Sequence, residues 1–428
     1  MKIYNINTLT KEEIDLLCKR NTDEDRSVAE RVQQLISDVR SHGDQALFEL
    51  TLRFDKAALD RLYLDKADLE ELAAAIGDAE KEALNVACEN IRKFHQSQIR
   101  DEQQVETTPG VTCWRENRPI ERVGLYIPGG TAVLPSTFLM VGVPARLAGC
   151  KEIVVCTPPQ ADGKINGYIA YCAVLLQIDR VYLVGGAQAI AAMAFGTETI
   201  PKADKIFGPG NQYVTKAKTM ILSATGTAID MPAGPSEVLV IADETSRPDF
   251  LAADLLAQAE HGIDSQSILV STSSDIIDRT IEAIYTQLRE LPRAAIAGKA
   301  IENSYAVKVD TLEQAMTFSN TYAPEHLILE TDLWQELIGK VSNAGSVFLG
   351  HLSPESVGDY ASGTNHTLPT SGFARAYSGV SVDSFVKKIT FQHISPAGIR
   401  HLGPAVEVLA ELEGLQAHKN AVSIRLKD

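Results

Sequence analysis

The feature that most constrains the fold is a repeated pattern in which a short apolar strand ends at a glycine or proline turn. Short apolar runs of the kind that form buried strands cover residues 123–127, 152–156, 181–184, 205–207, 237–241, 267–270 and 346–349. Helices rich in small residues follow several of the turns. Strands that alternate with helices form crossover units, which build a mostly parallel sheet. The sequence therefore predicts an α/β fold whose ligands bind at the carboxyl ends of the strands, where the turns lie.

The two ends of the chain depart from this pattern. The first hundred residues have apolar side chains at helical spacing, for example over residues 68–77, where a glycine ends the run. After Pro404, residues 405–413 predict one helix and residues 415–426 a second, rather polar segment. Because this tail has few apolar residues of its own, we expect it to pack on another surface, such as a second subunit.

Charge and cysteine usage exclude several classes of protein. The 428 residues carry a net charge of −16, so the chain lacks the basic excess with which proteins bind nucleic acid. The first residues lack the apolar core of a signal peptide, and a long uncharged segment, residues 125–145, contains three prolines and three glycines. Six cysteines occur without C-x-x-C spacing, which is typical of reduced thiols. We expect a cytoplasmic protein without a membrane or nucleic-acid partner.

Standard phosphate-binding loops are absent from the sequence. No G-x-x-x-x-G-K-[ST] motif occurs, and the turn at residues 208–213 lacks the third glycine of a dinucleotide fingerprint. Its Gly-Pro-Gly run could offer amides to an anion, but from spacing alone a tight turn that needs positive φ is the better explanation of the glycines. The paired glycines Gly129–Gly130 and Gly185–Gly186 allow the same two explanations.

Two short stretches suggest metal ligation or proton transfer, each with a structural alternative. Gln258 and His261 lie three residues apart at the end of a predicted helix, where they share a face. A histidine at that position also simply favours the helix dipole. Glu325 and His326 offer a carboxylate and an imidazole side by side for proton transfer. Considered alone, these two residues favour the alternative, a helical turn begun by Pro324 in which the glutamate stabilises the helix dipole.

A third stretch, residues 358–366, combines two glycines with Asp, Ser, Thr, Asn and His and has no large aliphatic side chain. A loop this polar has little reason to pack in a core, and loops on a rigid scaffold often carry function. Its composition therefore favours a functional site. By contrast, Glu413 and His418 in the tail look like solvated helix positions when they are considered alone.

Together these stretches resemble the histidinol dehydrogenase family. The matching segments are residues 118–130, 207–215, 233–240, 257–261, 322–327, 358–366 and 413–422. They occur in the family's order and cover nearly all of the chain from residue 118 onward. The first hundred residues resemble the family only in their helical character. Several separate motifs that match together are far more specific than any one of them.

The resemblance implies an activity and a set of site residues. Family members oxidise L-histidinol through histidinal to L-histidine, with two NAD+ reduced in turn and one divalent metal in each active site. That metal is usually zinc, although manganese or cobalt also suits such a donor set. By resemblance, the metal ligands are Gln258, His261, Asp359 and His418, of which the last comes from the other subunit of a homodimer. The remaining matches are Glu325 and His326 as the acid/base pair, Ser236, His366 and Glu413 as substrate contacts, and Tyr126, Gln188 and Asn211 as NAD contacts. The metal ligands and the acid/base pair contact the substrate as well.

The two acid/base residues suit two oxidations at one carbon. Removing hydride from an alcohol requires the hydroxyl proton to leave, and neutral His326 can accept it. Histidinal must then add water, which Glu325 can deprotonate. The hydrate again carries a hydroxyl and a hydride, so His326 can serve twice.

Strand pattern and resemblance together predict two incomplete Rossmann-like domains, with mostly parallel sheets and helical N-terminal and C-terminal extensions used in dimerisation. Residues 1–20 form an N-terminal helical arm. Residues 21–125 and 236–380 form a larger, discontinuous domain with the metal and acid/base residues, into which residues 126–235 are inserted as an NAD domain. Residues 381–428 form a small dimerisation tail that supplies His418.

Two other functions remain as alternatives. A metabolite-binding protein without catalysis would keep its role after His326 is replaced. A zinc hydrolase with Glu325 as its base would turn over esters or amides without nicotinamide, but the chain lacks the His-Glu-x-x-His motif that usually supports this function.

Overall fold

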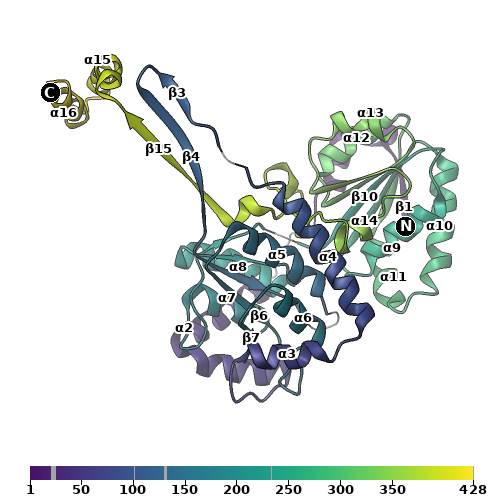
Figure 1. The fold of residues 1–428 in the computed structure, drawn as a ribbon. Coiled ribbons are helices and arrows are strands. Elements are labelled where there is room, and N and C mark those ends of the chain that lie inside the picture. Colours follow the sequence, from purple (N-terminus) through teal and green to yellow (C-terminus); the bar gives the residue numbers. More distant parts are fainter. Residues whose placement is uncertain (21–25, 101, 130–132, 233, 428) are drawn as a thin grey trace.

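The computed structural model describes residues 1–20, 26–100, 102–129, 133–232 and 234–427. It contains two six-stranded sheets, here called sheet A and sheet B, and a three-stranded sheet C that extends away from them (Figure 1). Gly130, Ala233 and the first residues of the predicted 21–125 segment lie outside the described residues. Within those residues, every strand predicted from an apolar run is present, which confirms the α/β fold with mostly parallel sheets.

Sheet A is parallel throughout. Its strands in spatial order are β1 (Lys2–Asn5), β12 (Tyr305–Lys308), β11 (Gln266–Ser271), β10 (Glu237–Ala242), β13 (His326–Glu330) and β14 (Ser346–Leu349). One face is covered by α9 (Pro248–Ala259), α10 (Ser274–Leu288) and α11 (Ala294–Asn303), and the other by α1 (Lys11–Leu17), α12 (Leu312–Tyr322) and α13 (Trp334–Leu337). Val238 and Val240 pack on the first face and Leu239 and Ile241 on the second, so β10 is apolar after Glu237 because both of its faces are buried.

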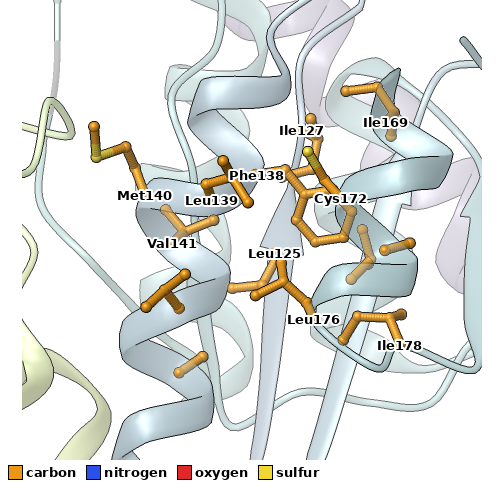
Figure 2. Packing of buried hydrophobic residues seen from close by; sticks show 14 of the residues in the cluster. Leu125, Ile127, Phe138, Leu139, Met140, Val141, Ile169, Cys172, Leu176 and Ile178 are labelled. Carbon is orange, nitrogen blue, oxygen red and sulfur yellow. The ribbon is translucent and has the colours of Figure 1, made fainter. Parts of the chain in front are cut away.

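Sheet B is parallel except for its edge strand β2. Its strands in spatial order are β2 (Tyr63–Asp65), β7 (Arg180–Leu183), β6 (Glu152–Thr157), β5 (Arg122–Tyr126), β8 (Lys205–Phe207) and β9 (Ala228–Ile229). One face carries α3 (Lys66–Ala74), α4 (Asp78–Gln96), α5 (Pro135–Ala148) and α6 (Gly167–Leu175), and the other carries α2 (Arg26–Asp55), α7 (Gly186–Phe195) and α8 (Gln212–Thr225). Figure 2 shows how Leu125 of β5 packs against Phe138 and Leu139 of α5, Cys172 of α6 and Leu176, which directly follows α6.

The pairing of the N-terminal region corrects two predicted boundaries. Residues 1–20 are not a purely helical arm, because β1 pairs with β12 at the edge of sheet A. Residues 26–125 do not belong with 236–380 as predicted. Their strand β2 pairs with β7, and the apolar side chains of α2, such as Val32 and Leu47, are buried on sheet B with α7 and α8. A helix pattern indicates that one face will be buried, but not which sheet will bury it.

A long arm leaves the body of the molecule and ends in two helices (Figure 1). Sheet C is antiparallel and contains β3 (Val105–Thr108), β4 (Val111–Pro119) and β15 (Val386–Ile394), followed by α15 (Pro396–Leu412) and α16 (Gln416–Arg425). The helix predicted to begin after Pro404 begins earlier, where Ser395 caps it, and Pro404 lies inside α15. Leu409 and Leu412 expose 59% and 78% of their surface, so the arm leaves apolar side chains uncovered within one chain.

None of the helices in the described part of the chain is both long and apolar enough to cross a membrane.

Candidate functional site

Three of the four predicted metal ligands and the predicted acid/base pair converge at the amino ends of β10 and β13 in sheet A. His326 begins β13 and Glu325 directly precedes it, so the alternative of a helical turn after Pro324 is wrong. This edge is opposite to the carboxyl edge at which we predicted ligands. Helix α9 returns antiparallel to β10, and its C-terminus therefore brings Gln258 and His261 back to the amino edge. The third side is α14 (Glu355–Tyr360), which carries Asp359.

Gln258 places a buried polar atom without a hydrogen-bond partner beside the acid/base pair. Its side chain is fully buried, and its Oε1 atom has no hydrogen-bond partner. Its amide nitrogen lies 3.4 Å from Oε2 of Glu325. A buried carbonyl oxygen without a partner costs free energy, so its presence in a folded protein calls for an explanation such as an ion.

Three more potential ligands surround the same space. His261, Glu355 and Asp359 each offer one ligand atom, and these atoms all lie within 4.8 Å of one another. Glu355 is 1% exposed, and its Oε2 atom also lacks a partner. An imidazole nitrogen, carboxylate oxygens and an amide oxygen form a donor set that suits a divalent metal. The residues in this chain therefore fit such an ion.

Sequence reasoning missed Glu355. It occupies the first turn of α14, where an acidic residue is ordinarily explained by the helix dipole. The available signal was its position three residues before the polar segment 358–366. Burial, together with the neighbouring carboxylates Asp359 and Glu325, raises the pKa of Glu355 to about 8, although His326 opposes the shift.

The acid/base pair is held against the backbone of β10. Oε2 of Glu325 accepts a hydrogen bond of 2.8 Å from the amide of Glu237, and Nδ1 of His326 lies 3.3 Å from the carbonyl oxygen of the same residue. On its other side, Nε2 of His326 lies 3.2 Å from Oδ1 of Asp359. Because a carbonyl oxygen can only accept, Nδ1 carries a hydrogen and Nε2 is the atom available for proton exchange.

Burial and charge shift the titration of this pair. Burial raises the pKa of Glu325 to about 7, against the opposing effect of His326. For His326, burial lowers the pKa, but the carboxylates of Glu355, Glu325 and Asp359 outweigh it and raise the pKa to about 10. Burial would raise the pKa of Asp359, but the hydrogen bond and charge of His326 lower it. The carboxylates thus stabilise positive charge here, either on His326 or on a bound ion. A divalent ion held by the same carboxylates would lower the pKa of His326 and leave its Nε2 atom free to accept a proton.

His366 joins this site to the other half of the molecule. Its Nδ1 lies 2.8 Å from the carbonyl oxygen of Asp359, and its Nε2 lies 3.1 Å from Oγ1 of Thr137 in the first turn of α5. Burial lowers the pKa of His366. Ser236 directly precedes β10, and its carbonyl oxygen accepts from the amide of Gln266. Two of the predicted substrate contacts, Ser236 and His366, therefore lie next to the acid/base pair.

The predicted NAD contacts lie at the carboxyl edge of sheet B, as expected from the strand pattern. Tyr126 ends β5, and its hydroxyl oxygen accepts from the amide of Gly186, 3.0 Å away, at the start of α7. Gln188 is buried in the first turn of α7, and Asn211 caps α8 through the amides of Tyr213 and Val214. The amino ends of two helices thus face the edge where phosphates ordinarily bind. The acid/base pair and these residues belong to different sheets.

Gly208, in the turn after β8, adopts a φ of +120°, which supports the tight-turn explanation. A Cβ atom there would lie 2.1 Å from the carbonyl oxygen of Tyr126. We expect Gly208→Ala to lower the free energy of unfolding by roughly 3 kcal/mol. Gly226 is the matched control, with a φ of +71° and open space around it, so its alanine variant should lose about 1 kcal/mol. Equal urea midpoints for the two variants would contradict this account.

Two predicted residues do not reach the site within one chain. His418 on α16 and Glu413 after α15 are exposed at the end of the arm, and Figure 1 shows α16 far from α9 and α14. Their contribution from a second copy stays a prediction.

Most of the chain matches a known protein family. The family model described as histidinol dehydrogenase matches residues 18–426. The histidinol dehydrogenase of Bacteroides thetaiotaomicron is 52% identical over 417 residues, which cover 97% of each chain. The chloroplastic histidinol dehydrogenase of Arabidopsis thaliana is 50% identical over 432 residues, which cover 100% of this chain and 92% of that protein. A crystal structure of histidinol dehydrogenase from Elizabethkingia anophelis has a TM-score of 0.96 at 52% identity, and the match covers 100% of this chain and 98% of that one.

Proposed function

The chain belongs to the histidinol dehydrogenase family, and from this premise we propose how its residues carry out the reaction. Histidinol dehydrogenases are NAD-dependent oxidoreductases of histidine biosynthesis, and this chain oxidises L-histidinol to L-histidine. The observation that carries the proposed roles is the convergence of Gln258, His261 and Asp359 beside the buried Glu325–His326 pair.

The proposed metal ligands are Gln258, His261 and Asp359, with zinc as the ion and His418 of the partner subunit as the fourth ligand. The unpaired Oε1 of buried Gln258 supports this set. The bound ion would supply a Lewis-acid anchor for the imidazole and amine of histidinol and would balance the charge of the surrounding carboxylates. The exposed apolar side chains of α15 and α16 support a dimer in which the arm reaches a second copy.

In the first oxidation, Nε2 of His326 takes the hydroxyl proton of histidinol while the carbinol hydrogen leaves as hydride to NAD+. This step yields histidinal, NADH and a protonated His326, which then releases its proton to solvent. The hydrogen bond from Nδ1 to the Glu237 carbonyl fixes the ring so that Nε2 makes the transfer.

In the second oxidation, Glu325 deprotonates the water that adds to histidinal, and the hydrate forms. His326 then accepts a hydroxyl proton of the hydrate while hydride passes to a second NAD+, and histidine results. A carboxyl whose pKa is raised to about 7 by burial can gain and lose a proton near neutral pH. Ser236, His366 and the partner subunit's Glu413 contact the substrate, and Tyr126, Gln188 and Asn211 contact NAD+.

Mixing the purified protein with histidinol and NAD+ tests the activity, with NADH followed by absorbance. We expect two NADH for each histidine formed, and loss of turnover in a strong chelator with recovery on adding zinc. Unchanged turnover after the metal content falls to zero would overturn the metal proposal. Ester or amide turnover without nicotinamide would support a hydrolase instead.

Glu355 gives a separate prediction about metal affinity. Glu355→Gln removes one carboxylate that faces the ligand cluster, so we expect divalent metal affinity to fall by about ten- to a hundredfold in chelator competition. Glu330→Gln is the matched control, because Glu330 is equally buried but pairs with His351 away from the cluster. If both variants bind zinc as tightly as the wild-type protein, Glu355 does not act on the ion.

A further inference from the structure

Arg20, which lies in a segment without a recognised motif, makes a dense set of buried contacts next to the site. Its Nε and Nη2 atoms donate to the two carboxylate oxygens of Glu237, each at 2.8 Å. Its Nη1 atom donates to the carbonyl oxygens of Cys18 and Tyr322, at 2.8 and 2.7 Å. The guanidinium also lies 3.4 Å from the centre of the Tyr322 ring. The side chains of Arg20 and Glu237 expose only 10% and 2% of their surface.

Glu237 is the residue whose backbone holds both proton-transfer groups. Its amide donates to Glu325, and its carbonyl oxygen faces Nδ1 of His326. Its side chain, in turn, is held by Arg20 and by the amide of Ser371. The backbone of this one residue, through the peptide units on either side of it, therefore sets the position of the carboxylate and the tautomer of the imidazole.

Tyr322 is the second point that Arg20 holds, on the segment that leads into the pair. Tyr322 ends α12, Ala323 follows with a φ of +55°, and Glu325 comes two residues later. A positive φ at a residue other than glycine costs free energy and persists only where its surroundings hold it. The bond from Arg20 to the Tyr322 carbonyl oxygen fixes the chain just before this turn.

We infer that Arg20 is a positioning residue, which joins the start of β10 to the turn before β13 and so holds Glu325 and His326 in register with each other. The guanidinium suits this task because its planar set of donors binds a carboxylate with two bonds and still reaches two carbonyl oxygens. A lysine ammonium keeps the charge but cannot reproduce that geometry. The inference rests on the proposed roles of Glu325 and His326.

A purely structural role for this ion pair predicts different behaviour. Removing one member of a buried pair leaves an unpaired charge and destabilises the fold, whereas replacing both members with apolar residues often restores stability. If the pair is only structural, removing both charges together should therefore leave stability and activity close to those of the wild type. A positioning pair stays important, because the backbone of Glu237 and the carbonyl of Tyr322 are then no longer fixed.

The test compares Arg20→Lys and the double variant Arg20→Met/Glu237→Leu with the wild-type enzyme, using the metal-loaded full chain. We expect kcat to fall at least about tenfold in both variants, with the KM for histidinol within about threefold and unchanged zinc content. The unfolding temperature of the double variant should stay close to that of the wild type. Arg146→Lys is the matched control, since Arg146 also bonds two carbonyl oxygens, but within the sheet B half, and its kcat should not change.

Combining Arg20→Lys with Glu325→Gln tests whether Arg20 acts through the acid/base pair or lowers the activity of the enzyme in some other way. If Arg20 acts through Glu325, the two losses in histidinal oxidation will not multiply. A stable double variant with wild-type kcat, or losses that multiply in full, would overturn the inference. Full activity in Glu325→Gln and His326→Asn would overturn the proposed roles themselves, whereas loss there with full activity in Arg20→Lys would remove only the role of Arg20.

Discussion

Replacing His326 with asparagine is expected to slow both oxidations by at least about a hundredfold. The variant keeps a side chain that can donate to the Glu237 carbonyl, but it has no group at the position of Nε2 that can accept a proton. Because we propose that the same atom accepts the proton from histidinol and from the hydrate of histidinal, the oxidation of both substrates should slow. Turnover of each substrate, followed by NADH absorbance in zinc-loaded enzyme, measures the effect.

His351→Asn is the control for this variant. His351 also lies between two carboxylates, Glu330 and Asp332, but it is only partly buried and lies at the opposite edge of sheet A. We expect its turnover to match the wild type. Loss of histidinol oxidation alone in His326→Asn, with histidinal oxidation intact, would show that a different group serves the second step.

Replacing Glu325 with glutamine is expected to separate the two oxidations. Glutamine can still occupy the space beside the Glu237 amide, but it cannot take a proton from water. The first oxidation should stay within about tenfold of the wild-type rate, and the second should fall by at least about a hundredfold. Histidinal should accumulate, and the ratio of NADH to histidinol consumed should fall from two toward one.

The pH dependence of histidinal oxidation follows from the same group. Burial raises the pKa of Glu325 to about 7, and the base acts only in its ionised form. Wild-type oxidation of histidinal should therefore decrease as the pH falls below about 7, and Glu325→Gln should lack this decrease. A variant that still yields two NADH per histidinol, with the wild-type pH profile, would exclude Glu325 as the group that activates water.

The fold class could be predicted because its signal is local. Strands such as β5 and β10 are apolar runs that end at turns, and this pattern is visible in the chain itself. The partner sheet of the N-terminal helices was not predictable, because α2 and α4 show only that one of their faces must be buried. The four residues of β1 at the edge of sheet A are too few to give a pattern.

The site was harder to predict from its residues than the fold was. Gln258 and His261 gave a weak pair signal, and the resemblance, not the spacing, linked them to Asp359. For the metal and acid/base residues of sheet A, the structure differs from the expected carboxyl edge, because α9 and α14 bring polar groups to the amino ends of β10 and β13. Glu355 and Arg20 were missed because an acid in a first turn and a lone arginine have ordinary explanations until the fold shows what surrounds them.

The separation of the proposed proton acceptor and nicotinamide residues between two sheets has a consequence for inhibition. His366 and Thr137 connect the two halves beside the site. A compound that wedged between these side chains would widen the gap across which hydride must travel. It would block turnover without competing for the ion, and each half would keep its own packed core.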